Sequence, residues 1–307
     1  MWIKELIKLA IREDIGPGDI TTDYLIPPGQ EGVGVILAKQ RLVLAGTDVA
    51  HQVFRTFDEE LRLDWLKQDG DWVEAGETVM TGKGKLAALL KGERIALNFL
   101  QRLSGIATHV RGFVDVVADL PVRLVDTRKT TPGWRELEKY AVRVGGACNH
   151  RMGLFDGVLI KDNHIAACGG ILLAVRRARE KAHHLVRIEV EVSNAFEVEE
   201  ALQAGADVIM LDNMTDDQIR AATAVIAGRA LVEVSGNVTR SRLRDLATAG
   251  ADLISVGALT HSATAVDLSM RIQSGEAEAA RRGGGIPAGK GSRKADRRGT
   301  LKKSRQT

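Results

Sequence analysis

The sequence predicts an α/β fold, in which an incomplete parallel α/β barrel of six to seven strands follows an α+β N-terminal domain. Two observations lead to the barrel. From residue 122 onward, apolar runs of strand length alternate with helical patterns, and this βα repeat is typical of a parallel sheet covered by helices. Each apolar run is also followed by polar residues. In a barrel all the strand ends meet around one opening, so this pattern favours a barrel over a doubly wound sheet.

The first hundred residues are organised differently. An amphipathic helix is expected over residues 1–16, because charged residues interrupt any continuous apolar segment of the kind a signal peptide needs. Short β-like runs then alternate with Gly, Pro and Asp turns, and a long helix is expected over residues 92–120. With 307 residues the chain is long enough for more than one domain. The domains expected are an N-terminal α+β domain (1–104), a barrel catalytic domain (105–275) and a basic disordered tail (276–307).

The elements of the barrel follow from the same alternation. Strands are expected at 122–125, 157–160, 186–192, 208–211, 230–234 and 253–256, with helices at 134–144, 171–183, 195–204, 216–226 and 240–249. Two units share the sequence Ala-Gly-Ala-Asp before a strand, at 204–207 and 249–252. In both, the glycine can adopt the left-handed conformation that ends a helix. Apolar residues alternate with period two over 265–272, which predicts a seventh strand.

Composition excludes several classes of protein. The only cysteines are Cys148 and Cys168, too few for a disulfide framework or a four-cysteine zinc site, and this usage suits the cytoplasm. No apolar run approaches membrane-spanning length. The tail from residue 281 holds ten Lys and Arg and one Asp, a charge of +9, so the rest of the chain carries −6 of the net +3. We interpret the tail as a solvated extension rather than a nucleic-acid arm, because the body lacks a basic face.

Cations gather where the predicted strands end. Arg128 and Lys129 follow one apolar run, Arg151 follows a Gly-Gly pair, and Lys161 follows another apolar run. Guanidinium groups suit bidentate binding of carboxylate or phosphate, and lysines supply point charges. A single one of these residues could be a salt-bridge partner on the rim. Four of them in three successive loops predict an acidic ligand with more than one negative group.

Acidic and small residues follow the later strands. Glu191 and Asp212 could hold ribose hydroxyls, Mg²⁺ or a developing cation, although Asp212 could instead cap a helix. The turns 235–237 and 255–258 are built from small residues, which either cradle phosphate through backbone N–H groups or simply pack tightly. His150 and His164 could be neutral donors or positive ligand contacts, and neither has a partner at zinc-ligand spacing.

Beyond these patterns, the order of the motifs resembles the quinolinate phosphoribosyltransferase family. The motifs that carry the resemblance are EDIGPGDITT (13–22), ERIALNFLQRLSGIAT (93–108), DTRKTTPGWRELEKYAV (126–142), GGACNHRMGLFDGVLIKDNHI (145–165), EVEV (189–192), LDN (211–213) and EVSGN (233–237). They occur in linear order over about residues 1–273. One departure is Ala147, where the family usually has a third glycine.

The resemblance implies that the chain takes quinolinate and phosphoribosyl pyrophosphate with Mg²⁺ and makes nicotinate mononucleotide, pyrophosphate and CO₂. It also implies a homodimer, or a higher oligomer, with shared active sites. Quinolinate would be bound by Arg128, Arg151 and Lys161 with His150 and His164 nearby, and by Arg94 from the partner subunit. Lys129 would lie toward the phosphoribosyl group, and Ser235, Gly236, Asn237 and Gly257 would form the phosphate loop. The catalytic set would be Lys129, Lys161, Glu191 and Asp212, the last two also binding the metal.

Other functions compatible with these residues stay open from the sequence. Lys161 at a strand end could be the nucleophile of a Schiff-base barrel lyase, although such a lysine requires a desolvated amine of lowered pKa. A related transferase that uses another acidic acceptor would present the same cations.

Overall fold

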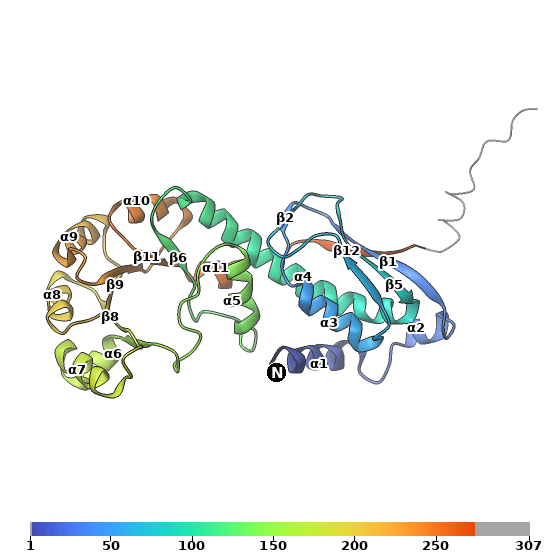
Figure 1. Cartoon of the computed structure of the whole chain (residues 1–307), viewed down its shortest axis with the longest axis horizontal. Helices are drawn as coiled ribbons and strands as arrows, with labels where there is room; N and C mark the ends of the chain where they lie inside the picture. Colours follow the sequence, from blue (N-terminus) through green and yellow to red (C-terminus); the bar gives the residue numbers. More distant parts are fainter. Residues whose placement is uncertain (1, 274–307) are drawn as a thin grey trace, which may run out of the picture.

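The computed structural model describes residues 2–273 and divides into two parts joined by one long helix (Figure 1). The N-terminal part carries an antiparallel sheet with strand order β12-β1-β5-β3, and the second part carries a parallel sheet with strand order β6-β11-β10-β9-β8-β7. Helix α4 (Leu86–Val114) connects them, and a short 3-10 turn (Asp115–Val117) follows it. The expected helix is therefore real, but it begins and ends about six residues earlier than the sequence predicts.

The N-terminal part packs helices against the four-stranded sheet, and β2 and β4 pair as a separate two-stranded antiparallel sheet. Its elements are α1 (Trp2–Ile15), α2 (Ile20–Leu25), β1 (Glu31–Ala38), β2 (Leu42–Val43), α3 (Thr47–Phe57), β3 (Arg62–Trp65), β4 (Trp72–Val73) and β5 (Thr78–Lys85). The amphipathic helix expected at the N-terminus is α1, whose Ile7 is buried in the core. Within α4, Gly92 allows close packing, because a Cβ there would lie 2.6 Å from the ring of Phe54.

The second part has the βα order that the sequence predicts. Its elements are β6 (Arg123–Val125), α5 (Arg135–Val144), β7 (Val158–Ile160), α6 (Asp162–Cys168), α7 (Ile171–Lys181), β8 (Ile188–Val192), α8 (Ala195–Gln203), β9 (Val208–Asp212), α9 (Asp216–Ile226), β10 (Leu231–Ser235), a 3-10 turn (Arg240–Arg242), α10 (Leu243–Thr248), β11 (Leu253–Ser255) and α11 (Ala258–His261).

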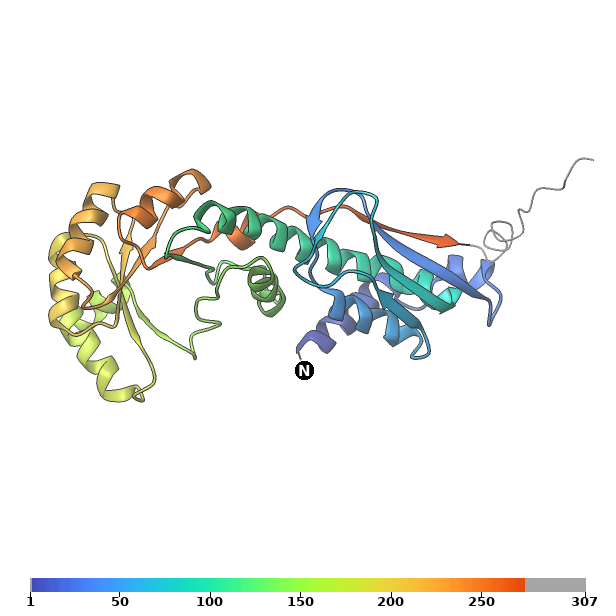
Figure 2. The same cartoon turned by 45° about the horizontal axis from the view of Figure 1, so that its top comes forward.

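All six strands of this sheet are parallel, and the order proves the barrel architecture. Strands β7 to β11 pair in sequence order, and β11 then pairs with β6, the first strand of the series. The helices α7 to α10 lie around the outside of the curved sheet (Figure 2). Strands β6 and β7 are not paired with each other, so the barrel is incomplete, as the sequence predicts.

Two helix ends repeat the same glycine geometry. Gly205 and Gly250 follow α8 and α10 with φ of 76° and 101°, and each allows the next residue to bond back into the last helical turn. Asp207 and Asp252 directly precede the strands, and each carboxylate accepts a backbone N–H from the neighbouring strand, at 2.7 Å from Ile188 and 2.8 Å from Val232. The shared Ala-Gly-Ala-Asp sequence therefore fixes where these strands begin.

One expected barrel strand belongs elsewhere. The alternating segment near residue 270 does form a strand, β12 (Leu268–Gln273), but it pairs antiparallel with β1 in the N-terminal sheet, from Ala38↔Leu268 to Val33↔Gln273. The seventh barrel strand is therefore a wrong prediction. A tail expected at 276–307 lies outside the described residues. Among the described residues, no helix is apolar enough over a sufficient length to cross a bilayer.

Candidate active site

A cavity of about 910 Å³ opens at the carboxyl ends of the parallel strands. All six strands contribute to its wall, either directly or through the loop that follows. Its lining includes Asp126, Thr127, Arg128, Lys129, His150, Arg151, Leu159, Lys161, Glu191, Met210, Asp212, Asn213, Glu233, Ser235, Gly236, Asn237, Val238, Ser255, Gly257, Ala258 and His261. The strand-end position is where barrel enzymes carry their chemistry.

Three of the cations that line the cavity have no acidic partner within residues 2–273. Among the described residues, the side chains of Arg128, Lys129 and Arg151 form no ion pair with any carboxylate. Burial and the nearby charge of Arg128 lower the pKa of Arg151. Like charges repel each other, so an anion bound between these two side chains would be stabilised.

A buried network holds the two loops that carry these cations. Asp126, the first residue after β6, is fully buried and forms an ion pair with Lys139 of α5. The Asp126 carboxylate also accepts the side-chain amide of Asn149 at 2.7 Å and the backbone N–H of His150 at 2.8 Å. Lys139 in turn donates to the carbonyl of His150 at 3.1 Å. The loop after β6 and the loop after α5 are thereby fixed to each other.

Lys161 ends β7 and forms an ion pair with Glu191 on the neighbouring strand β8. The Lys161 side chain keeps 41% of its surface exposed, so it is in contact with the open cavity rather than sealed from water. His164 plays a local part instead, since its Nδ1 accepts the backbone N–H of Lys161 at 3.0 Å at the start of α6. His164 is exposed and does not line the cavity.

At the end of the neighbouring strand β9, a strained loop holds Asp212. The Asp212 carboxylate accepts the side-chain amide of Asn213 at 2.6 Å, and Asn213 accepts that of Asn237 at 3.1 Å. Asn213 and Asn237 have φ of 55° and 50°, and Gly236 between the two strand ends has φ of 90°. A Cβ on Gly236 would lie 2.2 Å from the Asn213 side chain. Backbone strain of this kind gathers at functional sites.

Asp212 is not a helix cap. The N-cap of α9 is Thr215, whose hydroxyl accepts the backbone N–H of Gln218 at 3.3 Å. The capping role that the sequence left open for Asp212 is therefore wrong, and its carboxylate is available to the cavity.

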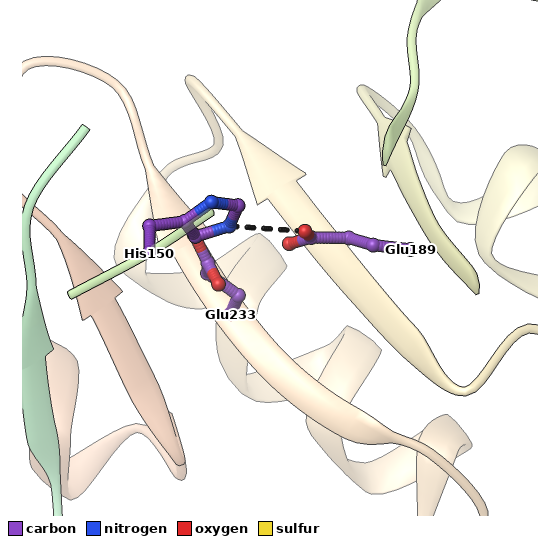
Figure 3. A group of neighbouring side chains, drawn as sticks. All are labelled: His150, Glu189 and Glu233. Carbon is purple, nitrogen blue, oxygen red and sulfur yellow. Dashed lines mark hydrogen bonds and ion pairs between the residues drawn. The ribbon is translucent and has the colours of Figure 1, made fainter. Parts of the chain in front are cut away.

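The structure also gives His150 two partners, Glu189 and Glu233, which the sequence did not single out. His150 Nε2 lies 3.0 Å from Glu189 Oε2 and 3.5 Å from Glu233 Oε1 (Figure 3). Burial alone would lower the pKa of His150, but the hydrogen bonds and charges of the two glutamates outweigh it and raise that pKa to about 10. The sequence did contain one signal for these glutamates. Side chains two positions apart in a strand face the same side of the sheet. Glu189 therefore faces the same side as Glu191, and Glu233 the same side as Ser235.

The structure brings most of the expected residues into one place. The cavity is lined by Arg128, Lys129, His150, Arg151, Lys161, Glu191, Asp212, Ser235, Gly236, Asn237 and Gly257. His164 and Arg94 are the two that do not line it. Arg94 is exposed on α4 in the N-terminal part.

Two groups of residues could hold a metal ion. The ligand atoms of His150, Glu189 and Glu233 lie within 4.8 Å of one another, and no other such trio of His, Cys, Asp or Glu occurs in residues 2–273. The second group is Glu191 and Asp212, on neighbouring strands. Two carboxylates fit Mg²⁺, which takes its remaining ligands from phosphates and water. In the structure the Glu191 carboxylate forms an ion pair with Lys161.

Comparison with known proteins gives consistent matches. The family model described as quinolinate phosphoribosyl transferase, N-terminal domain, matches residues 19–104, and its C-terminal counterpart matches residues 106–271. A Bacillus subtilis protein named "Probable nicotinate-nucleotide pyrophosphorylase (carboxylating)" is 45% identical over 272 residues, which cover 89% of this chain and 94% of that protein.

Two further relatives agree. A chloroplastic nicotinate-nucleotide pyrophosphorylase (carboxylating) of Arabidopsis thaliana is 40% identical over 289 residues, covering 88% of this chain and 82% of that protein. The solved structure of the nicotinate-nucleotide pyrophosphorylase from Francisella tularensis superposes with a TM-score of 0.85 at 39% identity, covering 89% of this chain and 96% of that one.

Proposed function

The chain belongs to the quinolinate phosphoribosyltransferase family, and we propose that the strand-end cavity is its active site. The reaction is transfer of the phosphoribosyl group of phosphoribosyl pyrophosphate to quinolinate with loss of CO₂, which gives nicotinate mononucleotide and pyrophosphate. The chain is thus a pentosyltransferase of de novo NAD synthesis.

The observation that carries the site assignment is the set of unpaired cations. Arg128, Lys129 and Arg151 face one cavity without a carboxylate partner among the described residues. Arg128 and Lys129 are exposed and Arg151 is half-buried, so all three are open to an incoming anion, which each can bind through a charge-assisted hydrogen bond. Quinolinate brings two carboxylates and phosphoribosyl pyrophosphate brings three phosphates, so the two substrates supply the missing charge.

The positions of the cations divide the cavity between the substrates. Arg128, Arg151 and His150 come from the two loops that the buried Asp126 network joins, and we assign them to quinolinate. Lys129 passes over Gly257, since a Cβ on that glycine would lie 3.0 Å from Lys129 Cδ. Gly257 and the turn 235–237 are the small-residue loops expected for phosphate, so we assign Lys129 to the phosphoribosyl side.

The reaction follows from these charges. The ring nitrogen of quinolinate attacks the anomeric carbon of the sugar while the bond to pyrophosphate breaks, and pyrophosphate leaves with the bonding electrons. Glu191 and Asp212 line the cavity beside this centre and offset the positive charge that develops on the sugar. Mg²⁺, held by the same two carboxylates, would neutralise charge on the leaving pyrophosphate.

Decarboxylation needs no further cofactor. Once the ring nitrogen carries the ribose it is positively charged, and it accepts the electron pair left when the neighbouring carboxylate departs as CO₂. Arg128 and Arg151 then hold the carboxylate that stays on the product.

We further propose a homodimer with shared sites in the cytoplasm. Arg94 is exposed on α4 and does not line the cavity of its own chain. The N-terminal part of a second subunit would bring its own Arg94 to this cavity, in a two-fold arrangement where each chain serves the other.

The Schiff-base alternative is less well supported. A nucleophilic lysine needs to be desolvated and uncharged, whereas the Lys161 ammonium is paired with Glu191 and 41% exposed. This arrangement favours a permanent cation, which is what an anion site requires.

Product analysis tests the proposal. The purified chain, phosphoribosyl pyrophosphate, Mg²⁺ and quinolinate labelled with ¹³C at the carboxylate next to the ring nitrogen are incubated, and the products are identified by mass spectrometry. We expect nicotinate mononucleotide together with labelled CO₂. A nucleotide that forms only with a different acidic acceptor would contradict the assignment of quinolinate, and borohydride trapping of a substrate on Lys161 would favour the lyase.

A further inference from the structure

Arg102 lies where the long helix α4 meets two elements of the barrel, α5 and α11. Its guanidinium group donates to the Glu138 carboxylate on α5 at 2.9 Å, and to the carbonyls of Thr260 and Ala263 at 3.1 and 2.6 Å. Arg102 belongs to the same sequence motif as Arg94, but it does not line the cavity. A planar guanidinium can donate to acceptors in separate segments at once, and Arg102 thereby joins the three helices.

The Glu138 carboxylate also binds the loop after β6. The Glu138 side chain has no exposed surface, and besides Arg102 it accepts the hydroxyl of Thr131 at 2.8 Å and the backbone N–H of Thr131 at 3.2 Å. A buried carboxylate needs several donors, because its charge has lost its hydration. Thr131 follows Lys129 by two positions, so Glu138 fixes the loop just beyond that lysine.

Thr260 of α11 contacts the same loop at Lys129 itself. The fully buried Thr260 hydroxyl donates to the Lys129 carbonyl at 2.9 Å and lies 3.2 Å from the carbonyl of Gly257. Lys129 and Gly257 line the cavity, whereas Thr260 does not. The hydroxyl therefore ties the backbone of the loop that carries Lys129 to the backbone at Gly257 without reaching a substrate.

Another arginine holds this loop in a different direction. Arg135 of α5 donates to the hydroxyl of Thr130 at 3.0 Å and to the carbonyl of Met152 at 3.2 Å. Met152 follows Arg151, so these bonds connect the loop to the region assigned to quinolinate. The bonds made by Thr260 connect it instead to the region assigned to phosphate.

We propose that Arg102, Glu138 and Thr260 are positioning residues, which hold Lys129 over Gly257 on the phosphoribosyl side of the cavity. These three residues are called the Lys129 clamp below. That Lys129 binds phosphoribosyl pyrophosphate rests on the proposed function, whereas the contacts of the clamp do not. Glu138 and Thr260 have no exposed surface and Arg102 does not line the cavity, so all three act through Lys129 and not on the substrate.

Lys129 needs such support because its side chain is exposed and a lysine has a flexible four-carbon stem. The space above Gly257 is narrow, since a Cβ on Gly257 would lie 3.0 Å from Lys129 Cδ and 3.2 Å from His261 Nε2. An outward shift of the loop would move the Lys129 ammonium away from Gly257. Its attraction to a phosphate bound there would weaken with that distance.

Two buried carboxylates thus support two halves of the cavity. Asp126 fixes the loops assigned to quinolinate, through its bonds to Lys139 and to the loop after α5. Glu138 and its partner Arg102 fix the loop at Lys129. Damage to the Lys129 clamp should therefore weaken the use of phosphoribosyl pyrophosphate and leave the binding of quinolinate largely as it is.

Thr260→Val is the first test, because it replaces the hydroxyl by a methyl group of similar size. Amide hydrogen exchange of the whole chain, without substrate, is followed by mass spectrometry. Backbone amides of the loop that carries Lys129 are hydrogen-bonded, so their exchange reports on its order. We expect faster exchange over 127–131 and unchanged exchange over 147–151. Unchanged exchange over 127–131, or an equal rise in both segments, would overturn the proposal.

Steady-state kinetics of the same variant are the second test. With quinolinate saturating, the KM for phosphoribosyl pyrophosphate should rise by about three- to tenfold, the effect of losing one neutral hydrogen bond. The KM for quinolinate should change little. Thr260→Ser, which restores the hydroxyl, should return the KM for phosphoribosyl pyrophosphate toward that of the unaltered enzyme. A parallel rise of both KM values, or no recovery in Thr260→Ser, would contradict the positioning role.

Arg102→Gln removes the cation that pairs with Glu138, and should raise the same KM while lowering the stability of the fold. Arg111→Gln is the matched control, because Arg111 is another half-buried arginine of α4 that donates to barrel carbonyls, those of Gly145 and Val144. It should also lower stability but leave the KM for phosphoribosyl pyrophosphate unchanged. Equal rises of that KM in both variants would mean that it follows stability and not the Lys129 clamp. If Arg102→Gln does not fold, the two threonine variants decide.

The Lys129 clamp and the proposed function fail separately. If quinolinate were not a substrate while Thr260→Val still loosened residues 127–131 alone, the proposed function would be wrong and the positioning of Lys129 would stand. If nicotinate mononucleotide formed but Thr260→Val changed neither the exchange of 127–131 nor the KM for phosphoribosyl pyrophosphate, the function would stand and the clamp would be wrong.

Discussion

Lys139 and Asp126 form an ion pair in which neither side chain has any exposed surface. Burial lowers the pKa of Lys139 and raises that of Asp126, since each charge has lost its hydration. The three donors around Asp126 compensate for that loss. The pair lies directly behind the loops that carry Arg128, His150 and Arg151, so it couples the stability of the domain to the geometry of the cavity.

Lys139→Met should therefore destabilise the protein strongly. Removing the ammonium leaves the Asp126 carboxylate buried without its partner, which typically costs about 3–5 kcal/mol. The free energy of unfolding, from urea titration followed by circular dichroism, measures the loss. Lys181→Met, at the exposed end of α7, is the matched control and should change little. A similar small change in both variants would show that the buried pair is dispensable.

Arg128→Lys should reduce turnover without unfolding the chain. The substitution keeps the charge but loses the planar pair of donors that binds a carboxylate. Loss of a charged hydrogen bond of about 1.5–3 kcal/mol corresponds to roughly 10- to 100-fold in kcat/KM. Arg123→Lys, at the other end of β6, is the control. Normal quinolinate kinetics in Arg128→Lys would mean that Arg128 is only a rim residue.

The acceptor should be a dicarboxylate. Nicotinate lacks one of the two carboxylates and would leave a cation of the cavity without its partner. We expect a penalty of about 2–4 kcal/mol in transition-state binding relative to quinolinate. Competition between the two acids for a limiting amount of phosphoribosyl pyrophosphate, read by mass spectrometry, gives the ratio of their kcat/KM values. Equal use of both acids would refute the assignment.

Gly236→Ala should impair the phosphate loop. Gly236 has φ of 90°, and a Cβ would lie 2.2 Å from the Asn213 side chain and 2.8 Å from the Asn213 backbone nitrogen. Gly228 also has positive φ, of 74°, but nothing lies within 4 Å of its Cβ position. Both alanine variants should lose about 1 kcal/mol of stability from backbone strain. Only Gly236→Ala should also raise the KM for phosphoribosyl pyrophosphate. The new methyl group would displace Asn213, whose side-chain amide donates to the Asp212 carboxylate.

Arg94→Ala and Lys161→Ala should complement each other. Each variant alone should be nearly inactive if one chain supplies Arg94 and the other supplies the cavity. After random subunit exchange, half of the dimers are mixed and each has one intact site, so activity should recover to about a quarter of the unaltered enzyme. Native mass spectrometry confirms the exchange. Heterodimers without recovered activity would mean that Arg94 serves its own chain or only the fold.

The barrel could be predicted from the sequence because each of its signals is local. Each βα unit shows its own apolar run and helical periodicity, and in two units a glycine, at 205 or 250, marks the end of the helix. Because the units are parallel, their strand ends meet at one end of the sheet. The same locality explains the error at residues 268–273. Period two identifies a strand but contains no information about its partner, and here the partner, β1, is more than two hundred residues away.

The site could be predicted where a charged residue follows a strand, and was missed where one lies inside it. Arg128, Lys161 and Asp212 mark strand ends in the sequence, so their convergence follows from the fold. Glu189 and Glu233 lie within strands. A single carboxylate inside an apolar run does not by itself indicate a functional residue. In the structure both glutamates contact the imidazole of His150, which belongs to the loop after α5. That contact is between distant parts of the chain and cannot be read from the sequence.

The pairing of β12 with β1 also means that the N-terminal sheet is completed late while the chain is being made. The N-terminal sheet is interrupted by the whole barrel and receives its edge strand only when residue 273 has left the ribosome. Until then β1 presents an unpaired edge, which is the kind of surface through which nascent chains associate wrongly. A message cut short within the barrel therefore yields a protein with both an unfinished catalytic half and an exposed strand, and cellular quality control has a structural basis for recognising it.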